Sequence, residues 1–403
     1  MQNSLRRSQA QPGQRSLAAP VGNFPSHYRR RIAALVKRGR CFADLAACFP
    51  GLIFALATGY GSEAEQAACV EVVESGGSLK SAAEALGLPL WLRRLPAEAF
   101  DAPLVAVPCG STFASHIVNY VPESPQQSAL WLERVLFASQ TCGEEFAFWM
   151  GRQRRLIGSP RESTAIQFLG AWAWFSLNTE TRGHSLLRRP WQPSMGLARA
   201  VEEMQVWRRR IDLALKLAVI CPDAWLQDGT ALGFDIVRLK DVGEFVAEAK
   251  SMQNCLDQYA DQFDEWSARI FSIRNKGTRV ATLELAAEIS NGGLPNIAQL
   301  RGVRNRQVSP EVWQAVFLWL GSQRLRPIPA PRSAREIAHA RVELAQAIWQ
   351  PYVEAISGTR FAEQFLGKIA EHASSNRLRL NSVVPARRRT ARRPVALARP
   401  VAV

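Results

Sequence analysis

The stretch of sequence that decides the fold is RIFSIRNKGTRVATLEL, residues 269–285. Apolar and polar side chains alternate along residues 269–274 and again along residues 279–285, and this period of two is typical of β-strands. Between the two runs lies Asn275-Lys276-Gly277-Thr278, a four-residue connection whose glycine favours a tight turn. The stretch therefore predicts an antiparallel hairpin.

The residues around this hairpin extend the pattern. A short strand is expected at 234–239, and a third strand of a meander at 296–301, after the turn Asn291-Gly292-Gly293. Between the first strand and the hairpin, apolar residues spaced alternately by four and three predict one helical stripe, formed by Phe245, Ala249, Met252, Leu256, Tyr259 and Phe263.

Two later helices carry start signals. Ser309-Pro310-Glu311 combines an N-cap serine, a proline at the first helical position and an early acid. The apolar side chains expected to be buried there are Val312, Val316, Phe317 and Leu320. After a proline-rich linker, Ser333 and Glu336 form a capping-box pattern that opens a further helix.

The preceding part of the chain is rich in helical patterns, the clearest being Leu197, Val201, Met204, Trp207, Ile211 and Leu215. The neighbouring triplet Arg208-Arg209-Arg210 is open to two interpretations, a phosphate contact or a solvated helix face. We expect an α+β protein with a mainly helical N-terminal region followed by a small antiparallel β-meander packed with helices. The expected segments are a disordered basic segment (1–26), a helical domain (27–225), an α+β domain (230–325), C-terminal helices (332–375) and a disordered basic tail (376–403).

Charge is concentrated at the two ends. Residues 1–40 hold nine Lys or Arg, residues 377–403 hold eight Arg, and neither end contains an acid. Because these seventeen cations exceed the net charge of +15, residues 41–376 carry about −2. Cationic arms on a nearly neutral body suit binding to nucleic acid, and a solubilising tail is the alternative. The densest cluster comprises Arg387, Arg388, Arg389, Arg392 and Arg393.

Several classes of protein are disfavoured. With 47% hydrophobic residues, the 403-residue chain can bury a sizeable core. The apolar runs are too short for a membrane-spanning helix and the N-terminus lacks a signal-peptide pattern, so a cytoplasmic location without membrane contact is expected. Seven scattered cysteines and five separated histidines give no metal-binding spacing. Without a P-loop, HExxH or GxSxG motif, no metal or cofactor is expected.

Strand alternation gathers polar side chains on one face of the predicted meander. The residues expected there are Ser272, Arg274, Thr282, Glu284, Gln299 and Arg301, and the apolar face would hold Phe271, Ile273, Ala281, Leu283, Leu285, Ala298 and Leu300. The polar set can be the water-facing side of a half-buried sheet, or a patch on which a carboxylate, an amide and guanidinium groups act together. Glu284, Gln299 and Arg301 loosely resemble metal-dependent nuclease sheets, although no second carboxylate is placed beside Glu284.

The region as a whole resembles the C-terminal signature of the PcfJ-like proteins of conjugative plasmids and integrative elements. The matching residues are Asn254-Cys255-Leu256, Tyr259, residues 270–274, residues 281–285, Gln299-Leu300-Arg301-Gly302 and Asn305. The stretches at 49–52 and 90–96 also look like those of relatives. Relatives often carry His where this chain has Asn254, which puts any role of that histidine in doubt here. Cys255 is expected to pack on the helical stripe.

The resemblance implies a setting on mobile elements and no settled reaction. Our first hypothesis is a nucleic-acid-associated accessory protein of a mobile element. The alternatives are an enzyme acting on nucleic acid or nucleotide through Arg274, Glu284, Gln299, Arg301 and Asn305, and an adaptor whose helical region docks a protein partner. An exposed apolar patch on that helical region would favour the adaptor.

Overall fold

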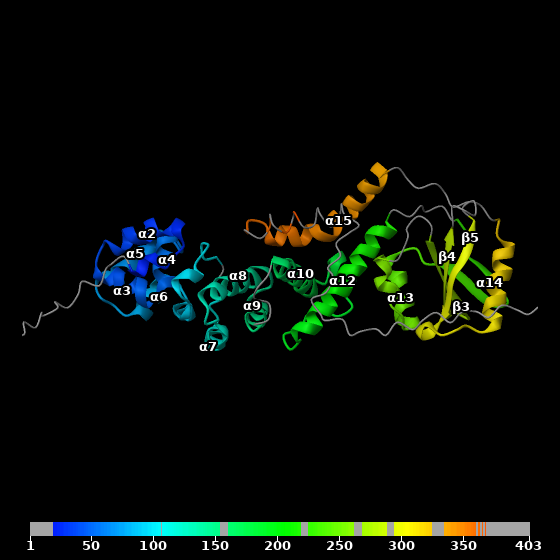
Figure 1. Cartoon of the computed structure of the whole chain (residues 1–403), viewed down its shortest axis with the longest axis horizontal. Helices are drawn as coiled ribbons and strands as arrows, with labels where there is room; N and C mark the ends of the chain where they lie inside the picture. Colours follow the sequence, from blue (N-terminus) through cyan, green and yellow to red (C-terminus); the bar gives the residue numbers. More distant parts are fainter. Residues whose placement is uncertain are drawn as a thin grey trace, which may run out of the picture.

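The computed structural model describes residues 19–105, 107–153, 160–218, 225–261, 268–287, 294–324 and 334–359, together with 362, 365 and 367. It has the expected α+β architecture, in which a long helical region precedes an antiparallel sheet. Figure 1 shows an elongated molecule, with the first helices at one end and the sheet at the other.

The helical region consists of α-helices of 4 to 21 residues and a few short 3-10 helices. Their bounds are α1 Ala19–Gly22, α2 Ser26–Val36, α3 Arg40–Cys48, α4 Pro50–Thr58, α5 Glu63–Glu74, α6 Leu79–Ala85, the 3-10 helices η1 Leu90–Arg94 and η2 Ala97–Ala99, α7 Ser111–Ile117, the 3-10 helix η3 Val118–Tyr120, α8 Pro125–Cys142, α9 Glu144–Gly151, α10 Pro160–Leu177, α11 Arg182–Ser185 and α12 Leu197–Leu217. Local signals fix several ends: Ser62 and Glu65 form a complete capping box at α5, and Gly59 ends α4 in the left-handed conformation.

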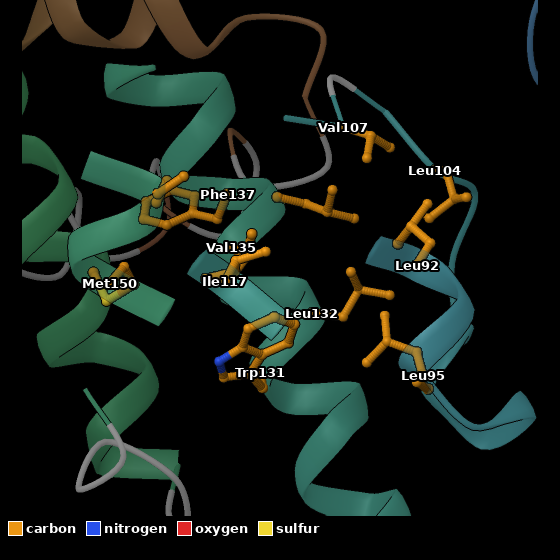
Figure 2. Packing of buried hydrophobic residues seen from close by; sticks show 14 of the residues in the cluster. Leu92, Leu95, Leu104, Val107, Ile117, Trp131, Leu132, Val135, Phe137 and Met150 are labelled. Atoms are coloured by element: carbon orange, nitrogen blue, oxygen red, sulfur yellow. The ribbon is translucent and has the colours of Figure 1, made fainter. Parts of the chain in front are cut away.

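Leucines after α6 join the first helices to the middle of the molecule. Figure 2 shows Leu92 and Leu95 of the η1 segment facing Leu132 of α8, with Trp131 close by. All four side chains are almost fully buried. The Trp131 indole donates a hydrogen bond to the carbonyl of Gly151 at 2.8 Å, which holds α9 against α8. Burial of apolar surface therefore continues from the N-terminal helices into α8 and α9 without a break.

The last helix, α15 (Ala334–Ile356), follows the sheet in sequence but packs back along α10 and α12 (Figure 1). Trp349 is its central contact: the ring centroid lies 5.4 Å from that of Trp207 on α12 and 6.1 Å from that of Phe168 on α10. Tyr352 and Phe365 complete this buried aromatic cluster. The expected C-terminal helices thus belong to the helical core, and the sheet is inserted between two of its helices.

The sheet has five antiparallel strands in the order β1-β2-β3-β4-β5. Their bounds are β1 Gly229–Ala231, β2 Phe234–Arg238, β3 Ala268–Asn275, β4 Thr278–Ala287 and β5 Pro295–Gly302. The expected hairpin is confirmed and is tighter than the sequence suggested, because Asn275 pairs with Thr278 and only Lys276 and Gly277 form the loop. Both loop residues have positive φ, at 47° and 81°, the backbone of a type I′ turn whose twist matches that of the strands.

Helices cover both faces of the sheet. On one face α14 (Pro310–Ser322) packs Val312, Val316 and Trp319 against the apolar side chains of β3 and β4. On the other, α13 (Val242–Met252), the 3-10 helix η5 (Leu256–Asp261) and the end of α12 enclose Ile270 and Ala268. Figure 1 shows α13 between the sheet and the helical region and α14 on the outer side. The water-facing interpretation of the polar face fails where α13 lies across it, whereas Gln299 and Arg301 at the edge of the sheet are exposed.

Two further expectations need correction, one position cannot be compared, and one strand was missed. The chain is already folded at α1, and Phe24 is fully buried, so the segment expected to be disordered does not extend to residue 26. The helical stripe from Phe245 stops at Met252, because Gln253 adopts the left-handed conformation, and its spacing resumes in η5. The position of Phe263 lies outside the described residues. The short strand β1 was not expected at all.

The apolar faces also differ in detail. A bulge in the β4–β5 pairing sets Glu284 against Gln299 but Leu285 against Ile297, which leaves Ala298 exposed and packs the partly buried Ile297 against the core. On α14, Phe317 is 59% exposed, because Ala315 and Trp319 take the face that meets the sheet.

The arginine triplet on α12 forms neither a phosphate-contacting surface nor a solvated helix face. Arg208 and Arg210 are buried, and Arg209 donates a hydrogen bond to Gln258 of η5. The guanidinium of Arg208 lies 4.1 Å from the centroid of the Phe168 ring, in a cation–π contact.

Among the described residues, no single helix is long and apolar enough to cross a membrane. The bent pair of α3 and α4, at 116°, passes that test only when its two helices are taken together.

Candidate polar site on the sheet

The register places the predicted polar residues on one face of the sheet. Thr282 on β4 lies opposite Ser272 on β3 and opposite Arg301 on β5. One step of two residues along β4, Glu284 lies opposite Gln299 on β5. Arg274 shares this side, and its Nε donates to the Ser272 hydroxyl at 3.2 Å. Because alternate residues of a strand point the same way, these side chains all face the side on which α13 packs.

A glutamate of α13 enters the middle of this face. Glu248 is fully buried, and its Oε1 accepts a hydrogen bond of 2.8 Å from the Thr282 hydroxyl. Its Oε2 lies 2.9 Å from Nε of Arg279 as an ion pair that does not meet hydrogen-bond geometry. Burial raises the pKa of Glu248, and hydrogen bonds from Ser272 and Thr282 together with the charges of Arg279 and Arg274 oppose that shift. Glu248 thus anchors α13 to the sheet.

Glu248 and Arg279 were not among the candidates from sequence. A signal for Glu248 was available, since Phe245, Glu248, Ala249 and Met252 follow the spacing of one buried helix face. The predicted stripe contained only apolar residues, so it did not include the Glu248 carboxylate.

The second carboxylate of this face is less enclosed. Glu284 is half-buried, and its Oε2 accepts a hydrogen bond of 3.0 Å from the hydroxyl of Tyr259 on η5. Burial raises the pKa of Glu284, with the Tyr259 hydrogen bond opposing the shift. Burial and the nearby charge of Glu284 raise the pKa of Tyr259 to about 12. The phenol therefore stays protonated at neutral pH and acts as a donor to the carboxylate.

The outer rim of the face is exposed and cationic. Gln299 and Arg301 of the edge strand β5 are exposed, as is Arg304 in the following 3-10 helix η7 (Val303–Asn305). Arg304 Nε donates to Oε1 of Gln253 at 2.6 Å, which ties η7 to the end of α13. Gln253, Arg304 and Asn305 all have positive φ, between 51° and 59°. Non-glycine residues adopt this left-handed conformation at a cost in free energy. The contacts between α13 and η7 must offset that cost, and they hold the rim in place.

The remaining family-motif positions lie around this rim. Asn254 turns the chain, because its Oδ1 accepts from the amide of Leu256 at 3.1 Å. Cys255 is exposed, so the expectation that it packs on the helical stripe is wrong: α13 has already ended. The buried Gly302 donates its amide to the carbonyl of Arg306 at 2.8 Å and closes the η7 turn.

The structure therefore brings together only part of the expected group of polar residues. Glu284, Gln299 and Arg301 lie on neighbouring strands at an accessible edge, whereas Arg274 is drawn toward Ser272 and Asn305 lies beyond the sheet in η7. Within the described ranges, no group of three or more His, Cys, Asp or Glu side chains is arranged to hold a metal ion. The face can offer one carboxylate, one phenol and exposed guanidinium groups to a ligand.

A second polar surface lies at the other end of the molecule. Six of the nine cations of residues 1–40 belong to α2 or lie between α2 and the start of α3, and all six are exposed: Arg29, Arg30, Arg31, Lys37, Arg38 and Arg40. Arg38 pairs with Glu74 at 2.6 Å, and Arg40 lies 3.9 Å from Asp44, the one acid of residues 19–61. Most of the N-terminal basic charge is thus carried by folded helices and not by a flexible arm. The arginines of the C-terminal tail lie outside the described residues.

Comparison of the chain with protein-family models, with curated proteins and with solved structures gave no match.

Proposed function

We propose that this protein is a nucleic-acid-associated accessory protein that binds phosphate through its basic surfaces. The observation that carries the proposal is the exposed cationic surface of α2 and its C-terminal end, where Arg30 and Arg31 lie on the helix and Lys37 is its C-cap residue. With a rise of about 1.5 Å per residue, Arg30 and Lys37 stand about 10 Å apart along the helix axis. Duplex DNA carries one charge per about 1.7 Å, so this length of helix can meet several phosphates.

The biological setting belongs to the same proposal. The resemblance to PcfJ-like proteins supports a role on a bacterial mobile element, and a cytoplasmic location would follow from that role. A protein with a basic end and a nearly neutral body would bind nucleic acid without strong sequence preference, because phosphate contacts carry no sequence information.

The proposal is tested with the full-length chain and the triple variant Arg30→Gln/Arg31→Gln/Lys37→Gln. Affinity for a labelled duplex is measured against salt concentration. The logarithmic salt slope should flatten by about 0.9 for each phosphate that the variant no longer neutralises. A matched control removes three exposed cations elsewhere, as Arg182→Gln/Arg189→Gln/Lys250→Gln, and should change the slope far less. Equal effects of the two triple variants, or no binding by the unaltered protein at low salt, would contradict the proposal.

An enzyme acting on nucleic acid or nucleotide is the second candidate, favoured by the pair of Tyr259 and Glu284. A half-buried carboxyl group with a raised pKa, on the same face of the sheet as the exposed Arg301, suits proton transfer next to a bound phosphate. The test incubates the protein with single-stranded DNA, duplex DNA, RNA and ATP, with and without Mg²⁺. Turnover that disappears in Glu284→Gln but persists in Glu311→Gln would support this candidate; the absence of turnover on all four would end it.

The adaptor hypothesis required an apolar patch on the helical region. The exposed large apolar side chains found there come from five different segments: Leu90, Val105, Leu130, Leu177 and Val342. The sheet domain differs, because Trp313, Phe317 and Leu318 are exposed together on α14.

A further inference from the structure

One helix carries an exposed aromatic pair. Trp313 and Phe317 of α14 are 37% and 59% exposed, and Leu318 beside them is 51% exposed. The two rings lie one helical turn apart, with centroids 5.7 Å from each other and planes inclined by 25°. They are therefore stacked on each other at the molecular surface and restrict each other's rotamers.

The packing of α14 explains why these rings remain outside. Its inward side is filled by Val312, Ala315, Val316 and Trp319, all of them buried against the sheet. The indole of Trp319 also donates a hydrogen bond of 3.1 Å to the carbonyl of Gln227, which fixes the helix in rotation. Trp313 and Phe317 are four residues apart and therefore share one side of the helix, and the inward side is already occupied by the four buried residues.

The segment that carries the pair is rich in positive charge. Described residues 294–324 contain four arginines and a single acid, Glu311. Arg306 comes shortly before α14, and Arg324 follows its end by two residues. A ligand that combines flat apolar faces with negative charge fits this arrangement.

We infer that the side of α14 formed by Trp313 and Phe317, the aromatic platform, stacks unpaired bases of single-stranded nucleic acid. Unpaired bases present their faces, whereas a duplex encloses them in its own stack, and base-on-aromatic stacking tolerates any sequence. The inference rests on the proposed function and gives it a substrate class. A second copy of the chain would fit less well, because joining two such faces brings the positive surroundings of each copy together.

The test compares a labelled twenty-nucleotide single strand with the matched duplex, using the full-length chain at fixed salt. The double variant Trp313→Ala/Phe317→Ala should weaken single-strand binding by at least about 5-fold and leave duplex binding nearly unchanged. Trp313→Tyr/Phe317→Tyr keeps two aromatic faces and should restore binding to within about twofold of the original protein. Leu318→Ala removes an exposed apolar side chain from the same helix without removing a ring and should have little effect. Thermal unfolding followed by circular dichroism checks that each variant is folded.

The possible results separate the platform from the proposed function. If the double variant binds both nucleic acids as the original protein does, the platform is wrong and phosphate binding stands. If the original protein binds neither at low salt, both fail. A Leu318→Ala loss equal to that of the double variant would indicate a general apolar contact and overturn the stacking role. A change from dimer to monomer in the double variant, with unchanged single-strand affinity, would assign this side of α14 to self-association.

Discussion

Arg210 on α12 and Asp257 on η5 form a buried ion pair that joins the helical region to the sheet domain. Nη2 and Nε of Arg210 lie 2.6 Å and 2.9 Å from Oδ2 of Asp257, and the side chains are only 6% and 7% exposed. The same guanidinium donates to the carbonyl of Leu186 at 3.1 Å. Since Tyr259 stands two residues after Asp257, this pair also positions the phenol that contacts Glu284.

Removing one member of the pair should be strongly destabilising. Arg210→Ala leaves the Asp257 carboxylate buried without its cation, so we expect a loss of about 3–5 kcal/mol in the free energy of unfolding. Arg210→Met/Asp257→Leu replaces both charges with apolar groups and should recover much of that loss. Urea unfolding of the single and double variants measures the difference. Arg209→Ala, at the exposed neighbouring position, should cost less than about 1 kcal/mol, and a similar cost for Arg210→Ala would refute the buried pair.

The anchor at Glu248 gives a second prediction. Glu248→Ala removes the acceptor of the Thr282 hydroxyl and the partner of Arg279 from a buried site. Because Arg279 is 26% exposed and can turn toward water, we expect a loss of about 2–3 kcal/mol, below that of a fully enclosed pair. Glu248→Gln retains an acceptor for Thr282 and should lose less in the same urea experiment. Equal losses for the two variants would mean that the Thr282 hydrogen bond contributes nothing.

The raised pKa of Glu284 predicts an unusual pH dependence. A carboxyl group with a higher pKa in the folded state binds its proton more tightly there, so its contribution to stability is present below the ordinary pKa and is lost as the pH rises through the raised value. Glu284→Gln, which cannot ionise, should therefore have a higher Tm than the original protein at pH 7. The difference should shrink toward pH 4, as measured by thermal unfolding across that range.

Glu311 is the control of opposite sign. A hydrogen bond from Ser309 lowers the pKa of this exposed carboxyl group, so its contribution to stability is present above the ordinary value and is lost as the pH falls. Glu311→Gln should lower the Tm at neutral pH and have less effect at pH 4. If both glutamine variants changed the Tm at pH 7 in the same direction, at least one of the two pKa shifts would be wrongly assigned.

The hairpin turn between β3 and β4 allows a stabilising change. Lys276 has φ of 47°, a conformation that asparagine adopts more readily than lysine. Lys276→Asn should increase the free energy of unfolding by about 0.5 kcal/mol. Lys276→Gln removes the same charge without the conformational preference and should give no gain. Gly277→Ala should cost about 1 kcal/mol, because φ there is 81°. Urea unfolding of the three variants checks all of these values.

The C-terminal tail gives the fifth prediction. Truncation after Ser382 removes Arg387, Arg388, Arg389, Arg392 and Arg393. If these arginines bind phosphate, affinity for DNA and RNA should fall, and the salt slope should flatten by about 0.7–0.9 for each phosphate left without its arginine. Thermal unfolding should be unchanged. Unaltered affinity and slope would leave the tail as a solubility device, and binding that survives truncation but disappears in Arg274→Ala or Arg301→Ala would move the interface to the sheet.

The sheet was predictable because its determinants are local. The alternation of residues 269–274 and 279–285 fixes which side chains share a face, and Gly277 fixes where the chain reverses. The pairing of Glu284 with Gln299 follows from the same alternation carried into β5. The bulge that exposes Ala298 has no such signal in the sequence. It depends on how β4 and β5 pair while both pack against the same core.

By itself, the sequence determined the periodic elements, the α+β class and the uneven charge, since these depend on residues close together in the chain. The tertiary structure decided which polar groups are buried. Arg208, Arg210 and Glu248 look like surface residues in a local pattern. They become interior only because α12 packs against α10 and η5 and because α13 packs against the sheet. The return of α15 to α12 was likewise invisible, because the contact between Trp207 and Trp349 joins residues more than a hundred positions apart. Such contacts arise from the joint burial of apolar surface by distant segments, which no local spacing encodes.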